Sequence, residues 1–231
     1  MPLPRGGSGS HRFQIGAAHG LYLVDPAAGE APVQGLVVVT LGPIGGGNFI
    51  PPADVVVTLN GVPLLRDPKL NGAFFRLDPD GPRPAIGSGG QMVIVAAGTD
   101  PADGRRIQRQ LVLDCPADIQ VGSSPPAGAS LGTAASLRIV SSSDLTVNAG
   151  VPLMANILPQ VMLFGYDAAT RSLAPSGSPR NISPGPLSVE VAVTPTAAEG
   201  WLLDLRWPGP FVLDGQTGGF CGLAKRWTYR K

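Results

Sequence analysis

The chain has few of the side chains on which most enzymes depend. Its 231 residues include two His and two Cys, and Lys and Glu occur three times each. The two cysteines, Cys115 and Cys221, lie far apart, and the sequence has no CxxC pair and no Cys/His cluster. A zinc site or a dithiol redox site needs such clustering. We therefore expect a non-enzymatic protein that holds no metal and no cofactor.

Charge is also scarce. Charged residues make up 14% of the chain and the formal net charge is +1, whereas ordinary domains are about 25% charged. Nucleic-acid-binding proteins concentrate positive charge on one face, and here only the last few residues do so. We do not expect nucleic acid as the main partner. A surface with so little charge is either covered by a partner, including copies of the same chain, or kept polar by Ser, Thr, Gly and Pro.

Long apolar runs are missing. No segment approaches the roughly 18 apolar residues of a membrane-spanning helix, so no membrane span is expected. Residues 1–10 carry a charge but lack the apolar core of a signal peptide. This pattern favours synthesis in the cytoplasm and incorporation into a virion or other particle, or secretion if a native signal has been removed.

Glycine and proline, by contrast, are abundant. The 32 Gly and 25 Pro fall between short apolar runs, which is typical of antiparallel sheets with frequent turns. Asn60–Gly61 predicts a tight hairpin, because both residues tolerate positive φ. Strands are expected at 21–24, 36–41, 55–59, 62–65, 74–77, 92–96, 107–113, 137–140, 145–147, 161–164, 187–193, 201–207, 211–213 and 220–229.

The strand pattern is interrupted once, at residues 116–136, which are rich in Pro, Gly and Ser and hold no apolar run. We therefore expect an all-β protein of two tandem antiparallel β-sandwich domains, immunoglobulin-like in outline. The expected organisation is a flexible N-terminal arm (1–12), sandwich domain 1 (13–118), a linker (119–136) and sandwich domain 2 (137–231). The alternative is one large jelly roll in which 116–136 form a long loop.

The sequence leaves the state of the cysteines open. Cys115 and Cys221 are either two small buried apolar side chains or one long-range disulfide formed in an oxidising compartment. The second case would join the two halves of the chain.

One segment matches the nucleophile-elbow pattern GxSxG. It is Gly128–Gly132, with Ser130 at its centre. That elbow needs a strand before the serine and a helix after it, but here a Pro-rich segment precedes and a strand is expected to follow. His11 and His19 both come before the serine, in the wrong order for the triad. A chance match explains the segment better than a hydrolase does.

Two loops carry paired carboxylates, Asp78–Gly81 and Asp100–Gly104. Calcium loops also carry such pairs, but neither segment supplies the further oxygen ligands that calcium needs. Asp side chains accept hydrogen bonds from the backbone of their own turn. We expect turn chemistry at both places.

Aromatic residues gather at the C-terminus. All three Trp lie in the last 31 residues, and Trp201 and Trp207 are expected in the core. The final strand interleaves aromatic and basic side chains, which is the composition of interface hot spots. The candidate partner-binding residues are Lys225, Arg226, Trp227, Tyr229 and Arg230. The alternative is a basic edge strand that discourages aggregation.

These observations favour a structural or interaction protein that belongs to a larger assembly, such as a phage or virion decoration or tail protein. Its partner would be another protein or a copy of itself, bound partly by strand addition at an exposed sheet edge. The alternative is a secreted or cell-surface binding module for carbohydrate or adhesion. That alternative is favoured by a Cys115–Cys221 disulfide or by an outward-facing Trp201 or Trp207.

Overall fold

A computed structural model provides the fold. It describes residues 13–24, 33–41, 51–68, 74–87, 89–100, 103–118, 120–132, 136–145, 160–167, 172–175, 180–181, 185–193, 199–208, 212–214 and 217–231. The regular structure in these residues is β-strand, without an α-helix. The expected all-β class is confirmed. The expected N-terminal arm, residues 1–12, lies outside the described residues.

Most of the expected strands are present. The strands are β1 (Phe13–Val24), β2 (Val33–Leu41), β3 (Val56–Leu59), β4 (Val62–Arg66), β5 (Phe74–Leu77), β6 (Gln91–Thr99), β7 (Arg106–Asp114), β8 (Val121–Ser124), β9 (Ser136–Leu145), β10 (Gln160–Asp167), β11 (Ser172–Pro175), β12 (Arg180–Asn181), β13 (Gly185–Ala192), β14 (Gly200–Pro208), β15 (Val212–Asp214) and β16 (Thr217–Arg230). Asn60 and Gly61 form the expected hairpin turn between β3 and β4, with φ of 45° and 80°.

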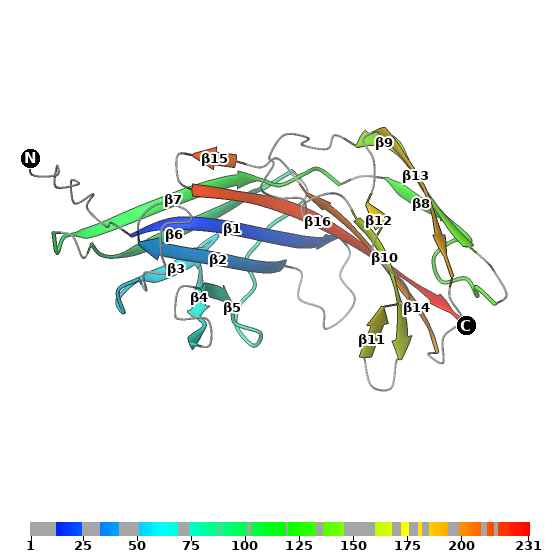
Figure 1. The fold of residues 1–231 in the computed structure, drawn as a ribbon, viewed down its shortest axis with the longest axis horizontal. Coiled ribbons are helices and arrows are strands. Elements are labelled where there is room, and N and C mark those ends of the chain that lie inside the picture. The colour runs from blue at the N-terminus through cyan, green and yellow to red at the C-terminus, as the bar shows by residue number, and fades with distance from the viewer. Residues whose placement is uncertain are drawn as a thin grey trace, which may run out of the picture.

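Most strands belong to one large sheet. Its order is β11-β10-β14-β16-β1-β2-β5-β4-β3-β6-β7, with β12 paired to β10 and β15 to β16. The longest strand, β16, runs through the middle of the molecule (Figure 1). On one side it pairs in parallel with β1, and on the other it pairs antiparallel with β14. The first and last strands of the chain are therefore neighbours.

The large sheet folds back on itself. Beyond β4 it turns through the short β3–β4 pairing into β6 and β7, and these strands contact β1, with β7 also contacting β16. Strand β6 alternates buried and half-buried residues along most of its length, the pattern of a strand with one face on a core. The result is a sandwich of two layers in this half of the molecule.

In the other half of the molecule, a second, smaller sheet packs on the large one. A three-stranded sheet, β13-β9-β8, lies against the sheet formed by β10, β14 and β16 (Figure 1). Leu137 and Ile139 of β9 are fully buried, as are Leu203 and Leu205 of β14. All four belong to the same apolar cluster as the core residues of β6 and β7, so the described core is continuous across both halves.

Three local expectations need correction. Residues 137–145 form one strand, β9, rather than two, because Asp144 and Leu145 continue the pairing with β13. The segment expected as a linker contains strand β8 and the buried Leu131. Strand β14 was expected to bury one face, but Leu202 and Asp204 on its other face are also buried.

Candidate interaction surfaces

The predicted partner-binding residues all lie on β16, and this strand is not a sheet edge. The pairing of β16 with β1 ends at Lys225, which lies opposite Val24. Beyond that point, residues 128–131 lie along the same side of β16. There Gly128 N–H donates to the Thr228 carbonyl at 2.8 Å, and Arg230 N–H donates to that of Ala129 at 2.9 Å. Both sides of β16 are thus occupied, and strand addition at this strand is blocked.

Two of the basic side chains are paired within the chain. Lys225 is mostly buried, and its Nζ lies 2.6 Å from Asp118 Oδ1. Arg226 Nη2 lies 3.5 Å from the buried Asp204 Oδ2. Breaking such a pair would leave an uncompensated, partly buried charge, so these two side chains offer less to a partner.

The two aromatic side chains face inward. Tyr229 is 2% exposed, and its hydroxyl donates to Ser123 Oγ at 2.7 Å. Burial raises the pKa of this phenol, while the hydrogen bond to Ser123 lowers it by a smaller amount. Trp227 is partly buried against the core. Arg230 is exposed, and its Nε donates to the Gly128 carbonyl at 3.1 Å. A role for these five residues in binding a partner stays a prediction.

One buried carboxylate was not singled out from the sequence. Asp204 is 2% exposed, and its Oδ2 accepts bonds from Arg206 Nε at 3.1 Å and Nη2 at 3.0 Å. Its other oxygen, Oδ1, has no hydrogen-bond partner among the residues that the structure describes. The neighbouring Arg206 and Arg226 balance the buried charge. The sequence signal was available, since Asp204 and Arg206 alternate with large apolar residues.

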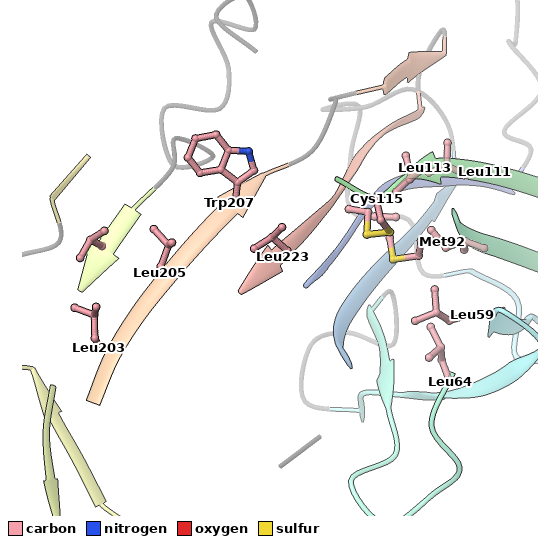
Figure 2. Close-up of a cluster of buried hydrophobic side chains, with 14 of the residues drawn as sticks. Leu59, Leu64, Met92, Leu111, Leu113, Cys115, Leu203, Leu205, Trp207 and Leu223 are labelled. Carbon is pink, nitrogen blue, oxygen red and sulfur yellow. A yellow bond between two sulfur atoms is a disulfide. The ribbon is translucent and has the colours of Figure 1, made fainter. Parts of the chain in front are cut away.

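The cysteines form a disulfide. Cys115 follows β7 directly and Cys221 lies in β16, and their Cα atoms are 4.8 Å apart. Both are buried. Figure 2 shows this bond beside Leu113 and Met92; Leu223, two residues beyond Cys221, pairs with Trp207 of β14. Of the two states that the sequence left open, the structure has the bonded one.

A free sheet edge lies elsewhere, at β7. This nine-residue strand ends the sheet order, and in the described part of the chain it pairs only with β6. It contains no Pro, and its pairing with β6 has no register shift. The outer face of the same layer also exposes apolar side chains, with Val56 55% and Val112 36% exposed. A strand was expected at residues 107–113, without a functional role.

The remaining sequence motifs have structural roles where they are described. Asp78 Oδ1 accepts from Asp80 N–H at 3.0 Å, and Asp103 Oδ1 accepts from Arg105 N–H at 3.1 Å. The prediction of turn chemistry is confirmed at both loops. Ser130 Oγ donates to the Lys231 carbonyl at 3.0 Å. Side-chain positions of His11 and His19 lie outside what the structure describes.

Among the described residues, no three His, Cys, Asp or Glu side chains lie close enough to hold a metal ion. The same residues include no helix long and apolar enough to cross a membrane. Comparison with protein-family models, with curated proteins and with solved structures finds no match to this chain.

Proposed function

We propose that this chain is a non-enzymatic structural and interaction protein that works in an assembly outside the reducing cytoplasm. The observation that supports this location most directly is the buried Cys115–Cys221 disulfide, which was also the feature expected of the secreted alternative. Structural disulfides persist in secreted, periplasmic and surface proteins and are rare where thiols are kept reduced. A bond between two buried sulfurs that closes a sequence separation of 106 residues fits a structural role.

The fold supports a rigid scaffold rather than a hinged pair of domains. We propose that the two sandwich-like layer pairs act as one body, because they share β16 and one apolar cluster. The segment between them is held to β16 by the disulfide, by the Lys225–Asp118 ion pair and by the Tyr229–Ser123 hydrogen bond. Such a body would present sheet surface in a fixed geometry.

The second candidate is a secreted or cell-surface binding module for carbohydrate or adhesion. The disulfide fits this function equally well. Carbohydrate binding by exposed aromatic platforms is disfavoured, because Trp201 and Trp207 are 2% and 4% exposed. A phage or virion decoration or tail protein is one form of the first proposal, and that identity rests on composition alone.

The test is the thiol state of the protein in its native cells. Cells are quenched in acid, the protein is denatured without reductant, and free thiols are then labelled with a maleimide polymer and detected by gel shift. We expect no shift unless a reductant is applied before labelling. Two alkylated cysteines without prior reduction would overturn the proposed location. Purified protein from the same cells would serve as the matched control for trapping efficiency.

A further inference from the structure

The outer edge of β7 has a regular set of backbone groups to which none of the described residues is paired. At the ends of the β6–β7 pair, Asp100 N–H donates to the Arg105 carbonyl at 2.7 Å and Cys115 N–H donates to that of Gly90 at 2.9 Å. Bonded pairs repeat every second residue in an antiparallel ladder. The odd-numbered residues of β7 therefore bond with β6, and the even-numbered residues direct their N–H and C=O groups away from it.

The even-numbered residues also have exposed side chains. They are Arg106, Gln108, Gln110, Val112 and Asp114, here named the β7 edge row. The row runs from a positive residue at one end to a negative residue at the other, with uncharged residues between. Native edges are usually blunted by short length, Pro, bulges or an inward charge. The nine-residue β7 has neither Pro nor a register shift.

We infer that β7 pairs with β7 of a second copy of this chain, antiparallel and about a two-fold axis through Gln110. This inference rests on the proposed interaction function and names a second copy as one partner. In this register Arg106 lies opposite Asp114 of the second copy, at both ends of the interface. Gln108 lies opposite Val112, and Gln110 opposite itself. Every outward-directed backbone group of the row then has a partner.

Charge complementarity selects this register. If the two-fold axis is moved by one residue to either side, even-numbered residues still pair with even-numbered residues. In that register, however, Arg106 and Asp114 no longer lie opposite a residue of opposite charge. Opposite charges directly across a strand pair are favourable and like charges are unfavourable. Asp114 Oδ1 already accepts from Gln91 Nε2 at 3.0 Å. An ionised carboxylate has about four acceptor positions, so this bond does not prevent the pair.

The experiment measures absolute mass by light scattering on the full chain across a concentration series. The wild type is expected to reach twice the 23.7 kDa of the single chain. Two variants, R106D and D114R, each place like charges opposite one another at both ends of the interface. Each is expected to raise the dimer dissociation constant about tenfold or more, since like-charge contacts cost several kcal/mol.

The decisive sample is an equal mixture of R106D and D114R. In a mixed dimer each variant supplies the charge that the other needs. One end of the interface then keeps the native Arg106–Asp114 pair, and the other end has an ion pair with the signs exchanged. The mixture is expected to dimerise at concentrations where each variant alone is a monomer, and the double variant R106D/D114R is expected to dimerise by itself. R105D, a matched charge change just outside β7, is expected to leave the dimer unchanged, and far-UV circular dichroism verifies folding.

A wild type that stays monomeric at every concentration overturns the inference. So does a dimer whose mass neither single variant changes, or a mixture that stays monomeric. None of these results bears on the thiol state in cells. Failure of the β7 interface is therefore distinguishable from failure of the proposed function, which the alkylation experiment decides.

Discussion

The hydroxyl of Tyr229 reaches Ser123 Oγ, 2.7 Å away and 106 residues earlier in the chain. The disulfide joins Cys115 to Cys221 across the same separation of 106 residues. Between them, Asp118 pairs with Lys225. Residues 115–118 and 120–123 therefore run alongside β16 in the same direction, held by a covalent bond, an ion pair and a hydrogen bond. This arrangement places the beginning of the expected linker on the core.

The disulfide is expected to supply a large share of the stability. Closing a loop of roughly 100 residues restricts the unfolded chain, and the entropic model gives about 4–5 kcal/mol for this. The double variant C115A/C221A is expected to lose that much free energy of unfolding in urea titrations. Reduced wild type is the control and should match it. A loss below about 1 kcal/mol would contradict the structural role.

The Tyr229–Ser123 bond is expected to couple the large sheet to the small one. Y229F and S123A should each lower the free energy of unfolding by about 0.5–1.5 kcal/mol, because each removes one hydrogen bond. In the double variant the two losses should not add, since both remove the same bond. Fully additive losses in the double-mutant cycle would mean that the bond contributes nothing.

The phenol of Tyr229 is expected to titrate at a higher pH than an ordinary tyrosine. Burial raises the pKa of its phenol above the usual 10.0, so the folded protein retains this proton when the unfolded chain has begun to lose it. The stabilising contribution is complete below pH 10 and is lost as pH rises above that value. Tyrosinate absorbance should show a late phase in the wild type that is missing from Y229F. An unchanged late phase in Y229F would assign it to another tyrosine.

Gly219 is expected to tolerate no side chain. A Cβ atom there would collide with the backbone oxygen of Ala18, where β16 and β1 lie side by side, and would lie 3.1 Å from Leu113 Cδ1. G219A should cost about 1–3 kcal/mol or more, as overpacking does. Gly122 in β8 is the matched control, because a Cβ there meets only Val140 Cγ2 at 4.0 Å. G122A should change the unfolding midpoint little.

Asn60 is expected to be the most sensitive turn residue. Its Oδ1 accepts from Val93 N–H at 2.6 Å, and its Nδ2 donates to the carbonyls of Ala85 and Gln91 at 2.8 and 3.0 Å. N60A loses these bonds. In addition, Ala tolerates the φ of about 45° at this position less well than Asn does. We expect a loss of about 2 kcal/mol or more in the free energy of unfolding.

N60D is the matched control for the turn. Asp keeps the acceptor for Val93 N–H and the tolerance for positive φ, but it cannot donate to the two carbonyls. Its unfolding midpoint should lie between those of the wild type and N60A. Equal stability of N60A and wild type would show that the turn alone, without the side-chain bonds, holds the hairpin.

The sequence by itself determined most of the strands and several turns, but not β8, β11 or β12. Period-two alternation located β13, and the Asn60–Gly61 pair located the β3–β4 hairpin, because both signals depend on neighbouring residues only. The roles of Asp78 and Asp103 also followed from local chemistry, since their side chains accept bonds from residues two positions ahead.

The tertiary structure alone decided which strands are neighbours. Backbone hydrogen bonds are alike in every strand, so local sequence does not encode that β1 pairs with β16 across about 200 residues. For this reason the C-terminal strand, expected from its composition to be a docking edge, lies in the interior of the sheet, while β7 became an edge. The disulfide was undecided for the same reason: Cys115 and Cys221 meet only because the sheet folds over and brings the end of β7 against β16.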